Sequence, residues 1–199
     1  MRIEGKAVEV YIPNTGRLPL LVPGTKVRLE PGKGKLPWRL SGMRYKGKWV
    51  SIDATIVNGL FERWVEEGRI FKGWKILAGE WEYEGKRFDF LLGRGNEKML
   101  VEVKSCTLER NGIALFPDAP TLRGREHLER LIEWVGEGKR GCMVFVTSLP
   151  GIRGFMPHDE TDPEFGRLFR EFLSEGGEAY LALFSWSGTL KEFLEVSCV

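Results

Sequence analysis

Residues 87–104 read RFDFLLGRGNEKMLVEVK. Apolar and polar residues alternate on both sides of Gly95-Asn96, an acceptable pair for the two-residue turn of a β-hairpin. The turn fixes the pairing of the two strands, because a slip of one residue would move every side chain to the opposite face. In this register one face is wholly apolar and consists of Phe88, Phe90, Leu92, Met99, Val101 and Val103. The segment therefore predicts an antiparallel hairpin with one face in a core.

The other face of the predicted hairpin sets two carboxylates opposite each other. Asp89 faces Glu102, and Lys104 follows two residues later on the same face. Like charges about 5 Å apart destabilise a hairpin unless one group is protonated or a divalent cation lies between them. Carboxylate oxygens favour Mg²⁺ or Mn²⁺ over zinc. Two acids and a lysine on neighbouring strands suit metal-assisted phosphodiester hydrolysis, in which Lys104 holds a water or a phosphate oxygen.

A plainer interpretation of this face stays open. A glutamate and a lysine two residues apart are common on solvated strands, where Glu102 and Lys104 would form only an ion pair. A third acid joins the set if a turn at Gly85-Lys86 places Glu82 opposite Asp89 on the adjacent strand.

Helical and strand periodicities alternate around the hairpin. Residues 54–67 predict a helix that ends at Gly68, and Thr121 is the N-cap of a second helix that extends to about residue 135. A third helix is expected at 163–174, and buried strands at 141–148 and 178–185. The alternation predicts a mixed α/β fold with a mixed central sheet over residues 53–199.

Residues 1–52 have a different composition and predict a small β-barrel or sandwich. Short alternating segments are separated by Pro and Gly turns. Residues 1–60 hold 11 Lys and Arg against 4 Asp and Glu, whereas residues 61–199 hold 19 against 24. A basic β unit with interleaved aromatic residues suits nucleic-acid binding, although most such aromatic residues belong to a core. The candidate DNA contacts are Arg17, Lys26, Arg28, Lys33, Lys35, Trp38, Arg39, Arg44 and Lys46.

Composition excludes several other classes of protein. Cys106, Cys142 and Cys198 are far apart and form no C-x-x-C pair, which argues against a disulfide framework or a zinc site and favours the cytoplasm. A packed thiol is a better interpretation of Cys106 than a nucleophile. The apolar runs are too short to cross a membrane, and no signal peptide opens the chain. Glutamine is absent, and this avoidance of a thermolabile amide is typical of a thermophile.

The second predicted helix carries polar residues on a stripe separate from its apolar face. Arg123 and His127 lie near its N-terminal end, where helix dipole and side-chain donors favour a phosphate. Asp118 precedes the helix and is a candidate to orient His127. Alternatively, these residues pair with neighbouring glutamates on a solvated face.

Asp89 and the Glu102-x-Lys104 string resemble the signature of restriction-endonuclease-like nucleases. In that superfamily the acids bind the metal and the lysine assists the attacking water, which implies these roles here. An acid of the preceding helix often contributes; Glu62 is the best candidate for it, and Glu66 is equally reachable. Phe88 stands where the superfamily often has proline.

Longer strings carry a closer resemblance, in order along the chain: IPNTG at 12–16, VPGT at 22–25, DFLL at 89–92, VEVKS at 101–105, ALFPDA at 114–119 and RGREHL at 123–128. Together they resemble the sugar fermentation stimulation protein A family over nearly the whole chain. The family implies an N-terminal OB-like barrel, a nuclease-like domain, and DNA binding with a regulatory role in sugar metabolism. It also favours Asn58, Asp118, Arg123 and His127 as support for the active site or a phosphate. Gly59 departs from it, because the family commonly has Arg after Asn58.

Three functions stay open at this point. The first is a DNA nuclease that uses Asp89, Glu102 and Lys104 with Mg²⁺ or Mn²⁺. The second is a non-catalytic DNA-binding regulator that keeps a nuclease-like fold. The third is an RNA-processing protein, since basic OB surfaces bind both nucleic acids. A homodimer is one candidate assembly, because restriction-type nucleases often dimerise to cut both strands.

Overall fold

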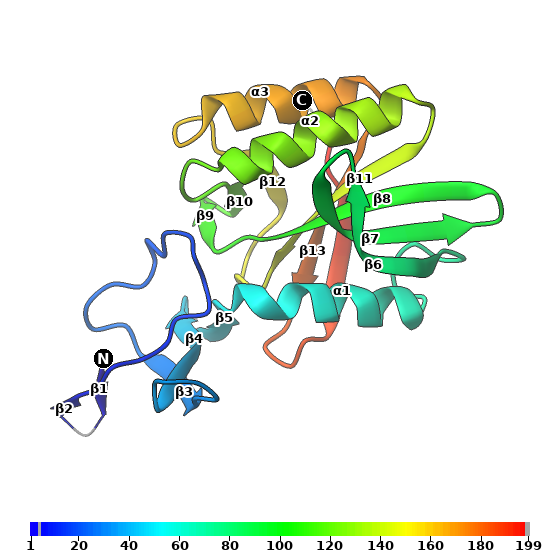
Figure 1. The fold of residues 1–199 in the computed structure, drawn as a ribbon. Coiled ribbons are helices and arrows are strands. Elements are labelled where there is room, and N and C mark those ends of the chain that lie inside the picture. The colour runs from blue at the N-terminus through cyan, green and yellow to red at the C-terminus, as the bar shows by residue number, and fades with distance from the viewer. Residues whose placement is uncertain (4, 198–199) are drawn as a thin grey trace.

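The computed structural model describes residues 1–3 and 5–197, so Cys198 lies outside the described residues (Figure 1). A six-stranded mixed sheet forms the centre of the larger part of the molecule, in the order β14-β13-β11-β8-β7-β6. Its strands are β6 (Lys75–Tyr83), β7 (Lys86–Arg94), β8 (Glu97–Ser105), β11 (Arg140–Thr147), β13 (Glu178–Phe184) and β14 (Leu190–Glu195). β8, β11 and β13 are parallel to one another, and the other pairings are antiparallel.

Helices cover both faces of this sheet (Figure 1). The short 3-10 turn η1 (Ala54–Ile56) leads into α1 (Val57–Glu66), whose apolar stripe packs with Phe90, Met99 and Val101. On the other face lie α2 (Leu122–Gly136) and α3 (Pro163–Ser174), which share a core with Leu91 and Leu100. Burial on both faces explains why the middle of β11, Cys142 to Val146, is continuously apolar. The mixed α/β class predicted from the sequence is confirmed.

Two smaller sheets adjoin the large one. β9 (Leu108–Arg110), β10 (Ile113–Phe116) and β12 (Gly154–Pro157) form one of them. The N-terminal part contains the pair β1 (Arg2–Ile3) and β2 (Lys6–Ala7) and an open sheet of β3 (Val27–Pro31), β4 (Trp38–Tyr45) and β5 (Lys48–Ser51). In the described residues these strands do not close into the barrel that the sequence predicted, because β3 and β5 pair only with β4. No helix of the described chain is long and apolar enough to cross a membrane.

The β7–β8 register agrees with the sequence prediction from the turn as far as Phe90. Phe90 pairs with Val101 and Leu92 with Met99, as the Gly95-Asn96 turn requires. The ladder ends at Phe90, however, and the β6–β7 ladder skips Asp89, where Glu80 on β6 has a φ of 49°. Across this position Phe88 and Phe90 belong to cores on opposite faces of the sheet, although regular alternation would place them on the same face.

Two predictions from the sequence are wrong in this part of the sheet. The pattern predicts Phe88 on the same apolar face as Phe90, but Phe88 packs on the α2 side, with its ring centroid 5.0 Å from that of His127. Glu82 was expected opposite Asp89, but it pairs with Arg87 and is exposed. The physical reason is that Glu84 and Gly85, both with positive φ, form the turn in place of Gly85-Lys86.

Glu109 on β9 ties the N-terminal part to the rest of the molecule. Tyr45 and Lys46 donate to its Oε1, and the backbone N–H of Gly112 donates to its Oε2 at 2.8 Å. Burial opposes the charged form of Glu109, but these partners outweigh burial and lower the pKa of Glu109 from 4.5 to about 2. The N-terminal part therefore docks through a buried, ionised carboxylate.

We expect Glu109→Gln to lower the free energy of unfolding by about 1–3 kcal/mol at neutral pH, because charged hydrogen bonds are lost. Because the pKa of Glu109 is lower in the folded than in the unfolded protein, its carboxylate stabilises the folded state fully above pH 4.5. This stabilisation is lost as the pH falls toward 2. The difference in the free energy of unfolding between wild type and variant, measured by urea unfolding, should therefore become smaller as the pH falls over that range. Glu160→Gln removes an exposed partner of Arg110 and serves as the control. A difference that stays constant with pH would contradict this assignment.

Candidate active site

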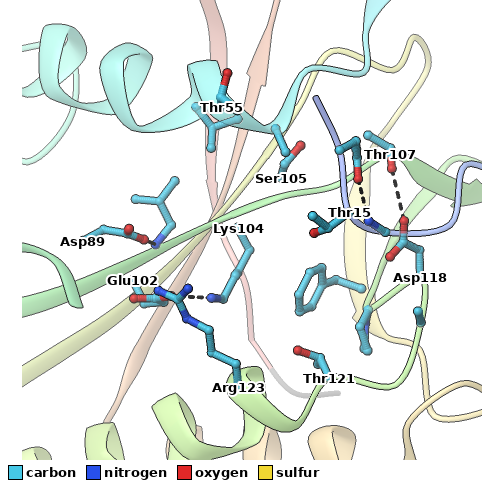
Figure 2. Close-up of a pocket in the computed structure, with 18 of the residues that line it drawn as sticks. Thr15, Thr55, Asp89, Glu102, Lys104, Ser105, Thr107, Asp118, Thr121 and Arg123 are labelled. Atoms are coloured by element: carbon cyan, nitrogen blue, oxygen red, sulfur yellow. Dashed lines mark hydrogen bonds and ion pairs between the residues drawn. The ribbon is translucent and has the colours of Figure 1, made fainter. Parts of the chain in front are cut away.

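A pocket of about 430 Å³ opens where β8 passes between the first turns of α1 and α2. One side carries Asp89, Glu102, Lys104 and Arg123, and the other carries Asp118 among hydroxyl side chains (Figure 2). The lining also includes Asn14, Thr15 and Gly16 of the N-terminal part. The pocket is thus built by segments that are far apart in the sequence.

Asp89 is held at the edge of the pocket by two hydrogen bonds. Asn58 at the start of α1 donates to its Oδ1 and the backbone N–H of Val103 donates to its Oδ2, each at 2.8 Å. Burial and the nearby charge of Glu102 raise the pKa of Asp89 above its ordinary value. A cation beside Asp89 would reverse this effect.

Glu102 lies deeper, with a side chain only 2% exposed. Burial alone would raise its pKa, but the charge of Lys104 and the contact with His127 outweigh burial, and the pKa of Glu102 lies below its ordinary value. Lys104 and His127 both contact Oε1, whereas Oε2 is buried and has no hydrogen-bond partner in the described chain. The second oxygen of Glu102 therefore lacks the partner that a buried carboxylate requires.

His127 links Glu102 to Arg123. Its Nδ1 lies 2.5 Å from Glu102 Oε1, and Arg123 Nε donates to its Nε2 at 3.5 Å. Apart from this close approach to the carboxylate, Nδ1 is buried and has no hydrogen-bond partner among the described residues. His127 is 2% exposed, so it does not lie on a solvated helix face. The prediction that Asp118 orients His127 is wrong, since Glu102 occupies that position.

Asp118 instead contacts the strap, a name used here for residues 14–17 of the N-terminal part. The backbone N–H of Arg17 and the Thr107 hydroxyl donate to its carboxylate, while burial raises the pKa of Asp118. Gly16 lies against the same carboxylate so closely that a Cβ would overlap it. The strap therefore forms one wall of the pocket.

Other predicted site residues fall elsewhere. Glu62, Glu66 and Glu82 are exposed and do not line the pocket, so the sequence-based choice of a third acid is not supported. Cys106 is a packed thiol, and burial raises its pKa. Among the described residues, no group of three or more His, Cys, Asp and Glu side chains is placed to hold a metal ion.

The predicted DNA contacts of the N-terminal part divide into two groups. Several already have intramolecular partners: Arg39 pairs with Asp53, Lys46 with Glu109, and Arg28 and Arg44 lie over the rings of Trp186 and Trp49. Lys26, Lys33 and Lys35 are exposed, Trp38 is half-buried, and Arg17 lies on the strap. The exposed lysines are those best placed to meet a polyanion.

Sequence patterns missed the hydroxyl side of the pocket. Thr15, Thr55, Ser105, Thr107 and Thr121 line it, yet none lies in a spacing that points to chemistry. The only signal was indirect, because Thr15 belongs to the string at 12–16 and Ser105 follows Lys104.

Comparisons with known proteins agree with this architecture. Residues 1–52 match a family model described as an N-terminal OB domain, and residues 55–189 match one described as the sugar fermentation stimulation protein RE domain. A sugar fermentation stimulation protein homolog of Caldanaerobacter subterraneus is 42% identical over 187 residues, which are 90% of this chain and 81% of that protein. A homolog of Thermotoga petrophila is 37% identical and covers 87% and 77% of the two chains.

A solved structure is also similar. It is described as Pyrococcus furiosus SfsA in complex with Ca²⁺. The match covers 99% of this chain and 89% of the Pyrococcus chain, with a TM-score of 0.88 and 31% sequence identity. Fold and pocket thus define a nuclease-like α/β domain that follows an OB domain. The chain belongs to the sugar fermentation stimulation protein family.

The close contact between the strap and Asp118 predicts that a methyl group added at Gly16 destabilises the protein. Gly16→Ala should lower the free energy of unfolding by about 1–3 kcal/mol, because its Cβ would displace a carboxylate that is held by hydrogen bonds. Gly34→Ala is the matched control, since nothing lies within 4 Å of its added Cβ. Urea unfolding checks both variants, and equal effects would contradict the close approach.

Proposed function

We propose that this protein binds DNA and hydrolyses its phosphodiester bonds in the pocket, with a divalent cation held by Asp89 and Glu102. The observation that carries the proposal is the unpartnered Oε2 of Glu102, a buried carboxylate oxygen beside a second carboxylate. Burial of such an oxygen is costly unless a cation or a donor reaches it.

The residues present fit a hard cation. Carboxylate oxygens are the ligands that Mg²⁺ and Ca²⁺ take, and Mg²⁺ keeps several waters when only one or two carboxylates bind it. The Pyrococcus furiosus relative was solved in complex with Ca²⁺, which supports a divalent cation in this family. Mg²⁺ or Mn²⁺ is the proposed cofactor. The cation would lower the pKa of an attacking water and offset charge that develops on the phosphate.

The chain's own side chains supply the remaining functions. Asn58 and the backbone N–H of Val103 fix the orientation of the Asp89 carboxylate. Lys104 and Arg123 line the same pocket and place positive charge where a phosphate would enter. His127 is a positioning residue that keeps Glu102 ionised and oriented.

A non-catalytic DNA-binding function is the second candidate, and one observation favours it. A third acid, Asp118, lines the pocket on the side away from Asp89 and Glu102 (Figure 2), and among the described residues no group of three or more His, Cys, Asp and Glu side chains is placed to hold a metal ion. The names of the relatives refer to stimulation of sugar fermentation, which suits a regulator. Such a protein would bind DNA with a steep dependence on salt and would cleave none.

The proposal predicts metal-dependent cleavage that requires Glu102. Purified protein with Mg²⁺ or Mn²⁺ should nick plasmid DNA, and EDTA should abolish nicking. Glu102→Gln keeps the shape of the side chain and removes its charge, so we expect the rate to fall by about 10²–10³-fold or more. Isothermal titration with Mn²⁺ should show weaker binding to this variant.

Glu97→Gln is the matched control, because Glu97 lies on the same strand but is exposed and pairs with Arg94. It should nick DNA at the rate of the wild type. Equal nicking by wild type and Glu102→Gln would refute the proposed site. DNA binding without metal-dependent cleavage at any protein concentration would favour the regulator.

A further inference from the structure

We infer that the pocket admits one unpaired nucleotide, so that single strands and unpaired segments are the preferred substrates over continuous duplex. This inference rests on the proposed function and specifies its substrate class.

The depth of the carboxylates is the first support. The side chain of Glu102 is 2% exposed and that of Lys104 is 16% exposed, so a phosphate must enter the pocket to reach them. The volume of about 430 Å³ lies in the range of small-molecule sites, about 300–1,000 Å³. Such a space suits a single nucleotide and is too small for a segment of duplex. Withdrawal of a nucleotide from a duplex costs free energy for unstacking and unpairing, and this cost is least for a strand that is already single.

The strap is the second support, because it closes the pocket on the side away from Asp89 and Glu102 (Figure 2). It is fixed at several points: Asn14 Nδ2 donates to the carbonyl of Ile52, and the N–H of Ala54 donates to that of Pro13, each at 3.0 Å. The contact of Gly16 with Asp118 adds a further attachment. A wall held in this way narrows the space beside Glu102 and favours a substrate smaller than a continuous duplex.

Exposed apolar residues that adjoin lining residues in the sequence are the third support. Leu122 is 69% exposed and lies between the lining residues Thr121 and Arg123. Ile56 is 36% exposed and lies between the lining residues Thr55 and Val57 on the α1 side. Apolar side chains insert between partly unstacked bases at some protein–DNA interfaces, and aromatic side chains stack on single-stranded bases. Together these two residues offer contacts to bases that have left a helix, whereas paired bases keep their faces covered.

The test uses one labelled oligonucleotide sequence in three forms: a single strand, a blunt duplex, and a duplex with a central unpaired bubble. Initial cleavage rates are measured with Mn²⁺, and binding is measured by fluorescence anisotropy in EDTA. We expect the single strand and the bubble to be cleaved at least about tenfold faster than the duplex, with cleavage of the bubble confined to its unpaired segment. The single strand should also bind more tightly than the duplex in EDTA.

Leu122→Glu places a negative charge beside the pocket without a change in the core. It should weaken binding of the single strand by about tenfold, because the base contact is lost and the phosphate is repelled. Leu77→Glu is the matched control, since Leu77 is a leucine of similar exposure, 55%, on β6 outside the pocket. It should leave single-strand binding unchanged.

The outcomes separate the two proposals. Cleavage of the duplex at the rate of the single strand would overturn the inference and leave the nuclease function intact. Absence of cleavage of all three forms would refute the nuclease function, and the binding measurements would then decide the inference alone. Equal affinity for single strand and duplex, or equal effects of the two leucine variants, would overturn it.

Discussion

The burial of Glu102 is the constraint on which the site and much of the fold depend. A carboxylate on an interior strand with a side chain 2% exposed costs several kcal/mol unless partners compensate its charge. Lys104 on the same strand supplies one partner, and His127 supplies the other. His127 can reach Glu102 only because the apolar stripe of α2 packs that helix onto the sheet. The packing of the core therefore determines the electrostatics of the pocket, and the Glu102 oxygen left without a partner is where the proposed cation would bind.

The N-terminal part belongs to the site as much as to the surface. Its sheet shares a core with the α2 face through Leu40, Met43 and Val50, and Glu109 accepts from two of its side chains. The strap then completes the pocket wall against Asp118. The net positive charge of the part that forms this wall would favour the approach of the proposed polyanion.

Most of the fold was predictable from local patterns. The predicted cap Thr121 accepts from the backbone N–H of Gly124, and α2 and α3 begin where the sequence predicts them. The helix predicted from residue 54 begins there as a 3-10 turn and becomes α-helical at Val57. The hairpin register followed from its turn residues. The sequence analysis missed β12 and β14. β12 has four residues and pairs with β10, which lies about 40 residues earlier in the chain, and β14 forms by pairing with β13. The irregularity at Glu80 and Asp89 was also missed, since a positive φ at a glutamate has no signature in the sequence.

The sequence by itself determined the hairpin, the helices, the family strings, and the presence of Asp89, Glu102 and Lys104 on adjacent strands. Tertiary structure alone decided which groups complete the site. It directed Asp89 to Asn58 and Glu102 to His127, excluded Glu62 and Glu82, and brought the strap to Asp118. The physical reason is that alternation and turn chemistry act over a few residues, whereas partners of a buried charge come from whichever segments pack around it.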